Sequence, residues 1–177
     1  METARRRKKG TKYFNMTAML MAYLTYEAYI NFLGERFAPD IWVNEREFFS
    51  KAPYQGIEGK LKKIQERCPI GAIEKGGRPY QTIKKLKDLR DFLSHCKPDK
   101  YYKTIIHTRD KEPPLFGKYD KLGTLVTPEK AEIAVADVKA FIGFLHKQAS
   151  RHTQDIWFAE ALEGIRGYST SESRTKT

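Results

Sequence analysis

Apolar side chains recur every three or four residues along most of the chain, and proline and glycine residues separate the apolar stretches. This spacing predicts a long, largely apolar helix that begins at residue 11 or 17 and ends near residue 37, where Ala38-Pro39 follows. It also predicts a short amphipathic helix over residues 56–68 and a third helix over residues 80–96. The pattern therefore favours an all-α fold.

The remaining stretches are less regular. Residues 41–49 fit either a helix or an extended segment, whereas the proline and glycine content of residues 68–79 predicts a loop. Short β-like pieces lie among prolines and glycines in residues 97–126, so we expect an irregular insertion there, with a short β-hairpin as one form of it. A threonine N-cap and a helix-starting proline open a strong helix over residues 127–149, and a last short helix is expected over residues 153–164.

The strong helix has an expected apolar face of aliphatic, alanine and phenylalanine side chains: Ile133, Ala136, Ala140, Phe141, Phe144 and Leu145. Together the elements predict one helical domain over residues 12–165, between a basic tail (residues 1–11) and a disordered Ser/Thr-rich tail (residues 166–177). We expect a bundle of four or five helices, with the irregular insertion of residues 97–126 after the third helix.

The composition adds a strong positive charge to this picture. The chain has 33 lysines and arginines against 22 acidic residues, a formal net charge of +11. This balance favours a polyanionic partner, nucleic acid before membrane, although a soluble basic surface without such a partner explains it as well. The two cysteines and four histidines show no zinc-ligand spacing, and widely separated cysteines fit a reducing compartment. We therefore expect no metal, no other cofactor and a cytoplasmic location.

The basic residues 5–9 and the apolar run after them imitate a signal peptide or membrane anchor. Two polar side chains, Glu27 and Asn31, lie inside that run, and a charge in the middle of a membrane span is costly. No small-residue cleavage pattern follows the run. We therefore expect a buried helix there and no membrane association.

The third predicted helix carries polar residues beside its apolar stripe. Four aliphatic residues form that stripe: Ile83, Leu86, Leu89 and Leu93. On a wheel of 100° per residue, Arg90 falls within about 60° of the centre of the stripe. Asp91 and His95, four residues apart, share one flank of the stripe and can touch each other.

The first helix has a comparable feature, because Glu27 and Asn31 fall on one stripe with two leucines. A buried arginine and a buried glutamate are both costly unless paired, so we expect Arg90 and Glu27 to face each other or a shared polar pocket. One interpretation is a purely structural bridge between two helices, with His95 exposed near a helix end.

A second interpretation is a site for RNA cleavage, which needs no metal when the 2′-hydroxyl attacks the adjacent phosphate. Such a site requires a group that transfers protons near neutral pH and a cation that holds the phosphate as charge develops. Histidine suits the first task and the planar guanidinium of arginine suits the second. Asp91 could orient the His95 ring and favour its protonated form, as would the C-terminal end of the helix dipole.

These residues resemble a known family. The stretch RDFLSH, from Arg90 to His95, is similar to the arginine–polar–histidine signature of HEPN domains (higher eukaryotes and prokaryotes nucleotide-binding). The stretch MAYLTYEAYINFL, with Glu27 and Asn31, resembles the opening helix of that family. The similarity covers roughly residues 16–95.

The resemblance implies an α-helical bundle that dimerises and brings two Arg–His motifs into one composite site. Many members are metal-independent endoribonucleases of toxin–antitoxin or phage-defence systems, which leave 2′,3′-cyclic phosphate and 5′-hydroxyl ends, whereas others are inactive modules that bind RNA, nucleotides or proteins. By position, Arg90 would hold the phosphate, His95 would transfer protons and Asp91 would support them. Supporting positions are expected at Glu27, Asn31 and Ser94.

Two features depart from the family pattern. Some of its toxins carry a tyrosine two residues after the histidine, which a partner nucleotidyltransferase modifies; Lys97 stands there instead, so we expect no such partner, while another antitoxin or regulatory protein stays open. The insertion of residues 97–126 interleaves cations with aromatic rings that can stack on bases, or is simply a solvated lysine-rich loop. The expected RNA-binding residues are Lys97, Lys100, Tyr101, Tyr102, Lys103 and Arg109.

Overall fold

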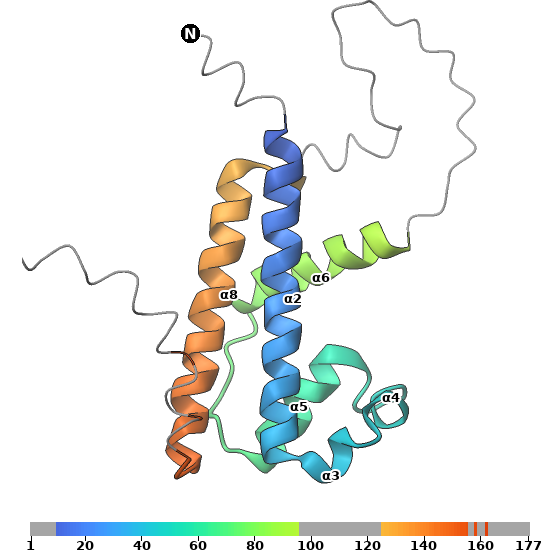
Figure 1. Ribbon diagram of the computed structural model, residues 1–177, viewed down its shortest axis with the longest axis vertical. Coiled ribbons are helices and arrows are strands. Elements are labelled where there is room, and N and C mark those ends of the chain that lie inside the picture. The colour runs from blue at the N-terminus through green and yellow to red at the C-terminus, as the bar shows by residue number, and fades with distance from the viewer. Residues whose placement is uncertain (1–9, 96–124, 156–157, 159–161, 163–177) are drawn as a thin grey trace, which may run out of the picture. The chain divides into compact units, whose positions relative to one another are not determined.

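The structure is a computed structural model that describes residues 10–95, 125–155, 158 and 162. These residues form helices joined by turns and loops, with no strand among them, which confirms the all-α prediction (Figure 1). The elements are α2 (Thr11–Phe37), α3 (Pro39–Trp42), α4 (Glu45–Phe48), α5 (Gly56–Arg67), α6 (Tyr80–Ser94), α8 (Pro128–Ala149) and a 3₁₀ turn (Ser150–His152).

The four long helices begin and end within a few residues of their predicted bounds. The ambiguous residues 41–49 are helical rather than extended, since they lie in and around α3 and α4. Residues 153–155, at the start of the predicted last helix, are not helical. Residues 1–9 of the predicted basic tail, the predicted tail of residues 166–177 and nearly all of the insertion of residues 97–126, including its hairpin, lie outside the described residues.

The chain divides into two compact units, and the boundaries between them fall inside α2 and α8. Among the described residues, the first unit contains residues 10–25, 76–95 and 125–138. The second unit contains residues 26–75 and 139–155, with 158 and 162. Both α2 and α8 are continuous helices, so each unit includes a part of both.

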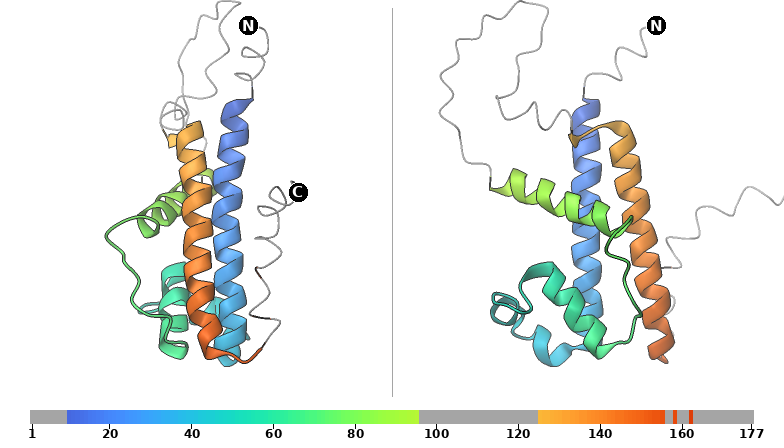
Figure 2. Two further views of the ribbon diagram at one scale, coloured as in Figure 1. Left: turned by 90° about the vertical axis from the view of Figure 1, so that its left-hand side faces the viewer. Right: turned by 180° about the vertical axis from the view of Figure 1, so that it is seen from behind.

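The first unit packs the beginning of α2 and the beginning of α8 side by side in the same direction, while α6 crosses α2 at a steep angle (Figures 1 and 2). The buried side chains of α6 are Tyr80, Ile83, Leu86 and Leu89. They face a core to which α2 contributes Met19, Ala22 and Tyr23, and to which α8 contributes Ala131, Ala134 and Val138. Alanines on the buried face of α8 allow helices to approach closely.

The helix that this apolar spacing predicts is confirmed by α8, but the apolar residues do not all lie on its buried side. Ile133, Ala136 and Ala140 are exposed and Phe144 is half-buried, whereas Phe141 and Leu145 are buried. The helix carries two overlapping apolar stripes, and the wheel alone does not decide between them. The structure buries the stripe that starts at Ala131 and Ala134. The start of α8 is confirmed, because the Thr127 hydroxyl accepts a hydrogen bond from the Lys130 amide at 3.3 Å.

Aromatic residues form much of the core of the second unit. Trp42 packs against Phe49 with ring centres 4.9 Å apart and lies over Gly34 of α2. A Cβ atom at position 34 would come within 1.9 Å of the indole ring, so glycine is required there for Trp42 to reach the helix. Among the described helices, none is both long enough and apolar enough to cross a membrane.

Candidate functional site

The candidate site lies on the last two turns of α6, within the first unit. Ile83, Leu86 and Leu89 of the predicted stripe are buried and anchor the helix in the core, whereas Leu93, its fourth member, is half-buried. Arg90 lies beside this stripe, and its side chain is 31% exposed as a whole although its Nε atom is buried. Because these apolar residues fix the rotation of α6, they determine which of its polar side chains lie at the surface.

A tyrosine ring and a carboxylate both contact Arg90. Its guanidinium carbon lies 5.3 Å from the centre of the Tyr23 ring, and its Nη1 atom lies 2.8 Å from Oδ1 of Asp91. Tyr23 is fully buried in α2, so its ring offers Arg90 a fixed surface for a cation–π contact. An arginine held in this way keeps one orientation at lower entropic cost when it binds an anion.

Asp91 binds two cations. Its Oδ2 atom accepts a hydrogen bond from Nζ of Lys87 at 2.6 Å, and its Oδ1 atom pairs with Arg90. The hydrogen bond from Lys87, together with the nearby charges of Arg90 and His95, lowers the pKa of the Asp91 carboxyl group. The carboxylate therefore stays ionised through the physiological pH range.

His95 follows the last residue of α6 and is exposed, as is Ser94 before it. The His95 amide donates a hydrogen bond to the Asp91 carbonyl at 3.0 Å, which places the imidazole at the C-terminal end of the helix. Both carboxylate oxygens of Asp91 already bind cations, so its predicted orientation of the His95 ring stays a prediction. The structure brings Arg90, Asp91 and His95 together on one helical segment and adds Lys87 to them.

The predicted supporting residues of α2 belong to the second unit. Glu27 is half-buried, and its predicted pairing with Arg90 stays a prediction because the two residues lie in different units. The side-chain oxygen of Asn31 accepts a hydrogen bond from Nζ of Lys60 at 2.7 Å, and the same ammonium group binds Glu45 at 2.6 Å. Asn31 thus takes part in a local network that joins α2, α4 and α5.

The six predicted RNA-binding residues lie outside the described residues: Lys97, Lys100, Tyr101, Tyr102, Lys103 and Arg109. The sequence places most of the excess positive charge in such segments. Residues 1–9 hold five basic residues and one acidic residue, and residues 96–124 hold seven basic and four acidic residues. The described residues together hold 18 basic and 14 acidic residues, so tests of RNA binding require the full chain.

The sequence prediction missed a second carboxylate in the first unit that binds an arginine. Asp137 of α8 is buried, and it accepts two hydrogen bonds of 2.8 Å from Arg78, one at each carboxylate oxygen. Thr82 of α6 adds a third hydrogen bond of 2.5 Å. The hydrogen bonds from Arg78 lower the pKa of the Asp137 carboxyl group. Both carboxylate oxygens of Asp137 are bound, and the residue is buried. Its contacts with Arg78 and Thr82 therefore join the start of α6 to α8.

A signal for Asp137 exists in the sequence. Asp137 directly precedes Val138 and follows Ala134 by three residues, so it interrupts the buried stripe of α8 much as Arg90 borders that of α6. Its partner could not be found in this way, because Arg78 lies in a loop where helical periodicity does not apply.

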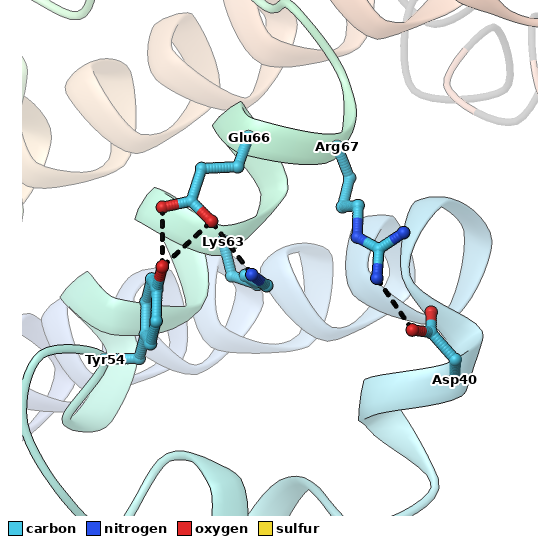
Figure 3. A network of polar contacts seen from close by, with 5 residues as sticks. All are labelled: Asp40, Tyr54, Lys63, Glu66 and Arg67. Carbon is cyan, nitrogen blue, oxygen red and sulfur yellow. Dashed lines mark hydrogen bonds and ion pairs between the residues drawn. The ribbon is translucent and has the colours of Figure 1, made fainter.

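Polar side chains of the second unit are also paired with one another. Figure 3 shows Tyr54 donating to Glu66 at 2.8 and 3.0 Å, Lys63 bound to Glu66 at 2.9 Å, and Arg67 bound to Asp40 at 2.7 Å. Glu66 and its hydrogen bond raise the pKa of the Tyr54 hydroxyl group. Lys63 and Arg67 are thus paired with carboxylates, as Lys87 and Arg90 are at the end of α6. The end of α6 differs in that an exposed histidine, His95, lies on the same short segment as its cations.

A buried histidine lies in the core of the second unit. The His146 Nδ1 atom is 3.0 Å from the Tyr29 hydroxyl oxygen, and its ring stacks on Phe158 with centres 4.9 Å apart. Burial raises the pKa of Tyr29, so its hydroxyl group stays protonated. His146 is 4% exposed, which keeps it from a large ligand such as RNA. In the part of the chain that the structure describes, no group of three or more His, Cys, Asp or Glu side chains is placed to hold a metal ion.

Comparison with known proteins found no match for the chain among family models, curated proteins or solved structures.

Proposed function

We propose that this protein is a metal-independent endoribonuclease whose active site is built around Arg90 and His95. One observation supports this most directly: the end of α6 presents a partly exposed arginine, fixed against the Tyr23 ring, and an exposed histidine within one short segment. Arginine binds phosphate oxygens through its planar fork, and histidine transfers protons near neutral pH. The resemblance of residues 90–95 to the HEPN signature points to the same reaction.

In the proposed reaction, the 2′-hydroxyl group of the RNA loses its proton and its oxygen attacks the adjacent phosphorus. The bond from phosphorus to the 5′-oxygen then breaks, and that oxygen takes up a proton. The products are a 2′,3′-cyclic phosphate and a 5′-hydroxyl end. Arg90 would stabilise the charge that grows on the non-bridging phosphate oxygens, and His95 would carry one of the two proton transfers. A homodimer with a composite site would supply a second histidine for the other transfer.

The biological setting that accompanies this proposal is a toxin or phage-defence effector acting on cellular or viral RNA in the cytoplasm. It rests on the resemblance alone. An antitoxin or regulatory protein would then be required to restrain the activity.

The test compares wild-type protein with His95→Ala and Arg90→Ala on structured RNA in the presence of EDTA. Removing a general acid or base lowers the rate about 100-fold or more, and removing the phosphate-binding cation has an effect of similar size. His152→Ala is the matched control, because His152 is also an exposed histidine at a helix end but belongs to the second unit. Mass spectrometry of the products identifies the expected ends. Equal cleavage by all variants, or no cleavage by the wild type, contradicts the proposal.

A second function, RNA binding without cleavage, has one observation in its favour. Lys87 and Arg90 together bind one anionic group, the Asp91 carboxylate, and two such cations can bind a phosphate group without a catalytic histidine. RNA affinity that survives His95→Ala, combined with no turnover by the wild type, would establish this alternative.

A further inference from the structure

Lys87 and Arg90 bind the same carboxylate from one face of α6. Lys87 precedes Asp91 by four residues and Arg90 by three, a spacing that brings their side chains together on the helix surface. Nζ of Lys87 lies 2.6 Å from Oδ2 and Nη1 of Arg90 lies 2.8 Å from Oδ1. Two cations therefore converge on one small anion.

A phosphodiester group would make similar demands on this pair. It presents two non-bridging oxygens that share one negative charge, and charge-assisted hydrogen bonds to such oxygens have the lengths seen here for Asp91. The side chains of Lys87, Asp91 and Arg90 are 37%, 33% and 31% exposed, so an anion from solution can reach them. Exposed ion pairs of this kind contribute little to stability, which means that an incoming anion can displace the carboxylate at low cost.

We propose that Lys87 and Arg90 together form a phosphodiester-binding site and that Asp91 is its resident competitor. The Asp91 side chain leaves the two cations when a phosphate of the RNA binds, and it returns when the product leaves. This inference rests on the proposed function for the identity of its ligand. It assigns Lys87 to the binding of substrate and gives Asp91 a restraining role, in contrast to the supporting role that the sequence predicts.

The inference is tested by fluorescence anisotropy of a labelled 2′-O-methyl RNA oligonucleotide added to the full chain. The oligonucleotide cannot be cleaved, because its 2′-oxygens are blocked. Asp91→Asn should tighten binding about fivefold, the effect of removing one exposed competing ion pair. Asp88→Asn is the matched control: it removes the same charge from an exposed position of the same helix. Equal effects of the two variants, or weaker binding by Asp91→Asn, overturn the inference.

Lys87→Met provides the second arm and Lys85→Met, at an exposed position of the same helix, is its control. Lys87→Met should weaken binding several-fold more than Lys85→Met and lower the slope of log affinity against log salt by about one. Equal effects of the two lysine variants contradict the inference. Circular dichroism establishes that each variant is folded, and Asp91→Ala replaces Asp91→Asn if the latter unfolds.

The two proposals fail separately. If the wild type binds the oligonucleotide but does not cleave unmodified RNA, the ribonuclease proposal fails, while the ranking of Asp91→Asn over Asp88→Asn still decides the inference. If wild-type protein cleaves RNA but the matched variants bind equally, the inference fails and the ribonuclease proposal stands.

Discussion

Asp137 and Asp91 are both carboxylates of the first unit, and each binds an arginine, yet their surroundings differ. The Asp137 side chain is 10% exposed and receives three hydrogen bonds from two residues, Arg78 and Thr82. The Asp91 side chain is 33% exposed and binds two cations on its own helix. Asp137 connects α8 to segments that are far away in the sequence, whereas both partners of Asp91 lie within four residues of it on the same helix.

This difference separates a structural cluster from a binding site. Asp137 is 10% exposed, so it would keep a poorly solvated charge if Arg78, which is 58% exposed, turned to an anion from solution. That cost opposes exchange of this ion pair. Asp91 is 33% exposed and would be solvated by water if it lost its partners. Its ion pairs can therefore exchange with an anion from solution. The same residue types therefore stabilise the fold in one place and remain available for a ligand in the other.

The largest expected effect is on stability. Asp137→Asn should lower the free energy of unfolding by about 1–3 kcal/mol, because it weakens the hydrogen bonds of a buried carboxylate to Arg78 and Thr82, whereas Asp91→Asn should change it by less than about 1 kcal/mol. Urea unfolding followed by circular dichroism measures both values. Similar losses for the two variants would show that the contacts of Asp91 at the end of α6 contribute as much to stability as those of Asp137 at its start.

The pH dependence of stability should sharpen the same contrast. The pKa of Asp137 is lowered in the folded state, so its contribution is fully present above the unfolded pKa of about 3.9 and is lost as the pH falls through the lower folded value. The difference in unfolding free energy between wild type and Asp137→Asn should therefore be constant from pH 7 to about pH 5 and shrink below about pH 4. A difference that grew toward acid pH would contradict this assignment.

The Tyr23 ring should matter for Arg90 through its face rather than its hydroxyl group. Tyr23→Leu removes the ring and should lower kcat/KM for RNA cleavage about tenfold, the equivalent of a cation–π contact of about 1.4 kcal/mol. Tyr23→Phe keeps the ring and should stay near the wild-type value. Rates are compared at a temperature at which urea unfolding shows both variants to be folded. Equal losses for the two variants would mean that the ring does not orient Arg90.

The smallest expected effect concerns salt. A double-mutant cycle on Lys87 and Asp91 should give a coupling of about 0.3–0.5 kcal/mol at low salt, and this coupling should fall toward zero at about 1 M salt, where exposed charges are screened. The coupling between Arg78 and Asp137 should fall less under the same conditions, because the Asp137 side chain is only 10% exposed although that of Arg78 is 58% exposed. A salt-resistant coupling at Asp91 would argue that its carboxylate is not displaceable.

Much of the candidate site could be predicted, because it lies on one helix. Helical periodicity placed Arg90 beside a buried stripe, and four-residue spacing placed Asp91 and His95 on one flank. The same spacing identifies Lys87 as a partner of Asp91, so the sequence contained this contact although the prediction did not use it. Tyr23 could not be found in this way, since its contact with Arg90 depends on how α6 crosses α2.

By itself, the sequence determined the four long helices α2, α5, α6 and α8, because periodicity, proline positions and the Thr127 cap act over a few residues and need no tertiary contact. It did not determine which of two apolar stripes on α8 is buried. Nor did it reveal that Asp137 meets Arg78, 59 residues away. Only the tertiary structure decided these points, because the burial of a helical face and the partner of a buried charge depend on the elements packed against them.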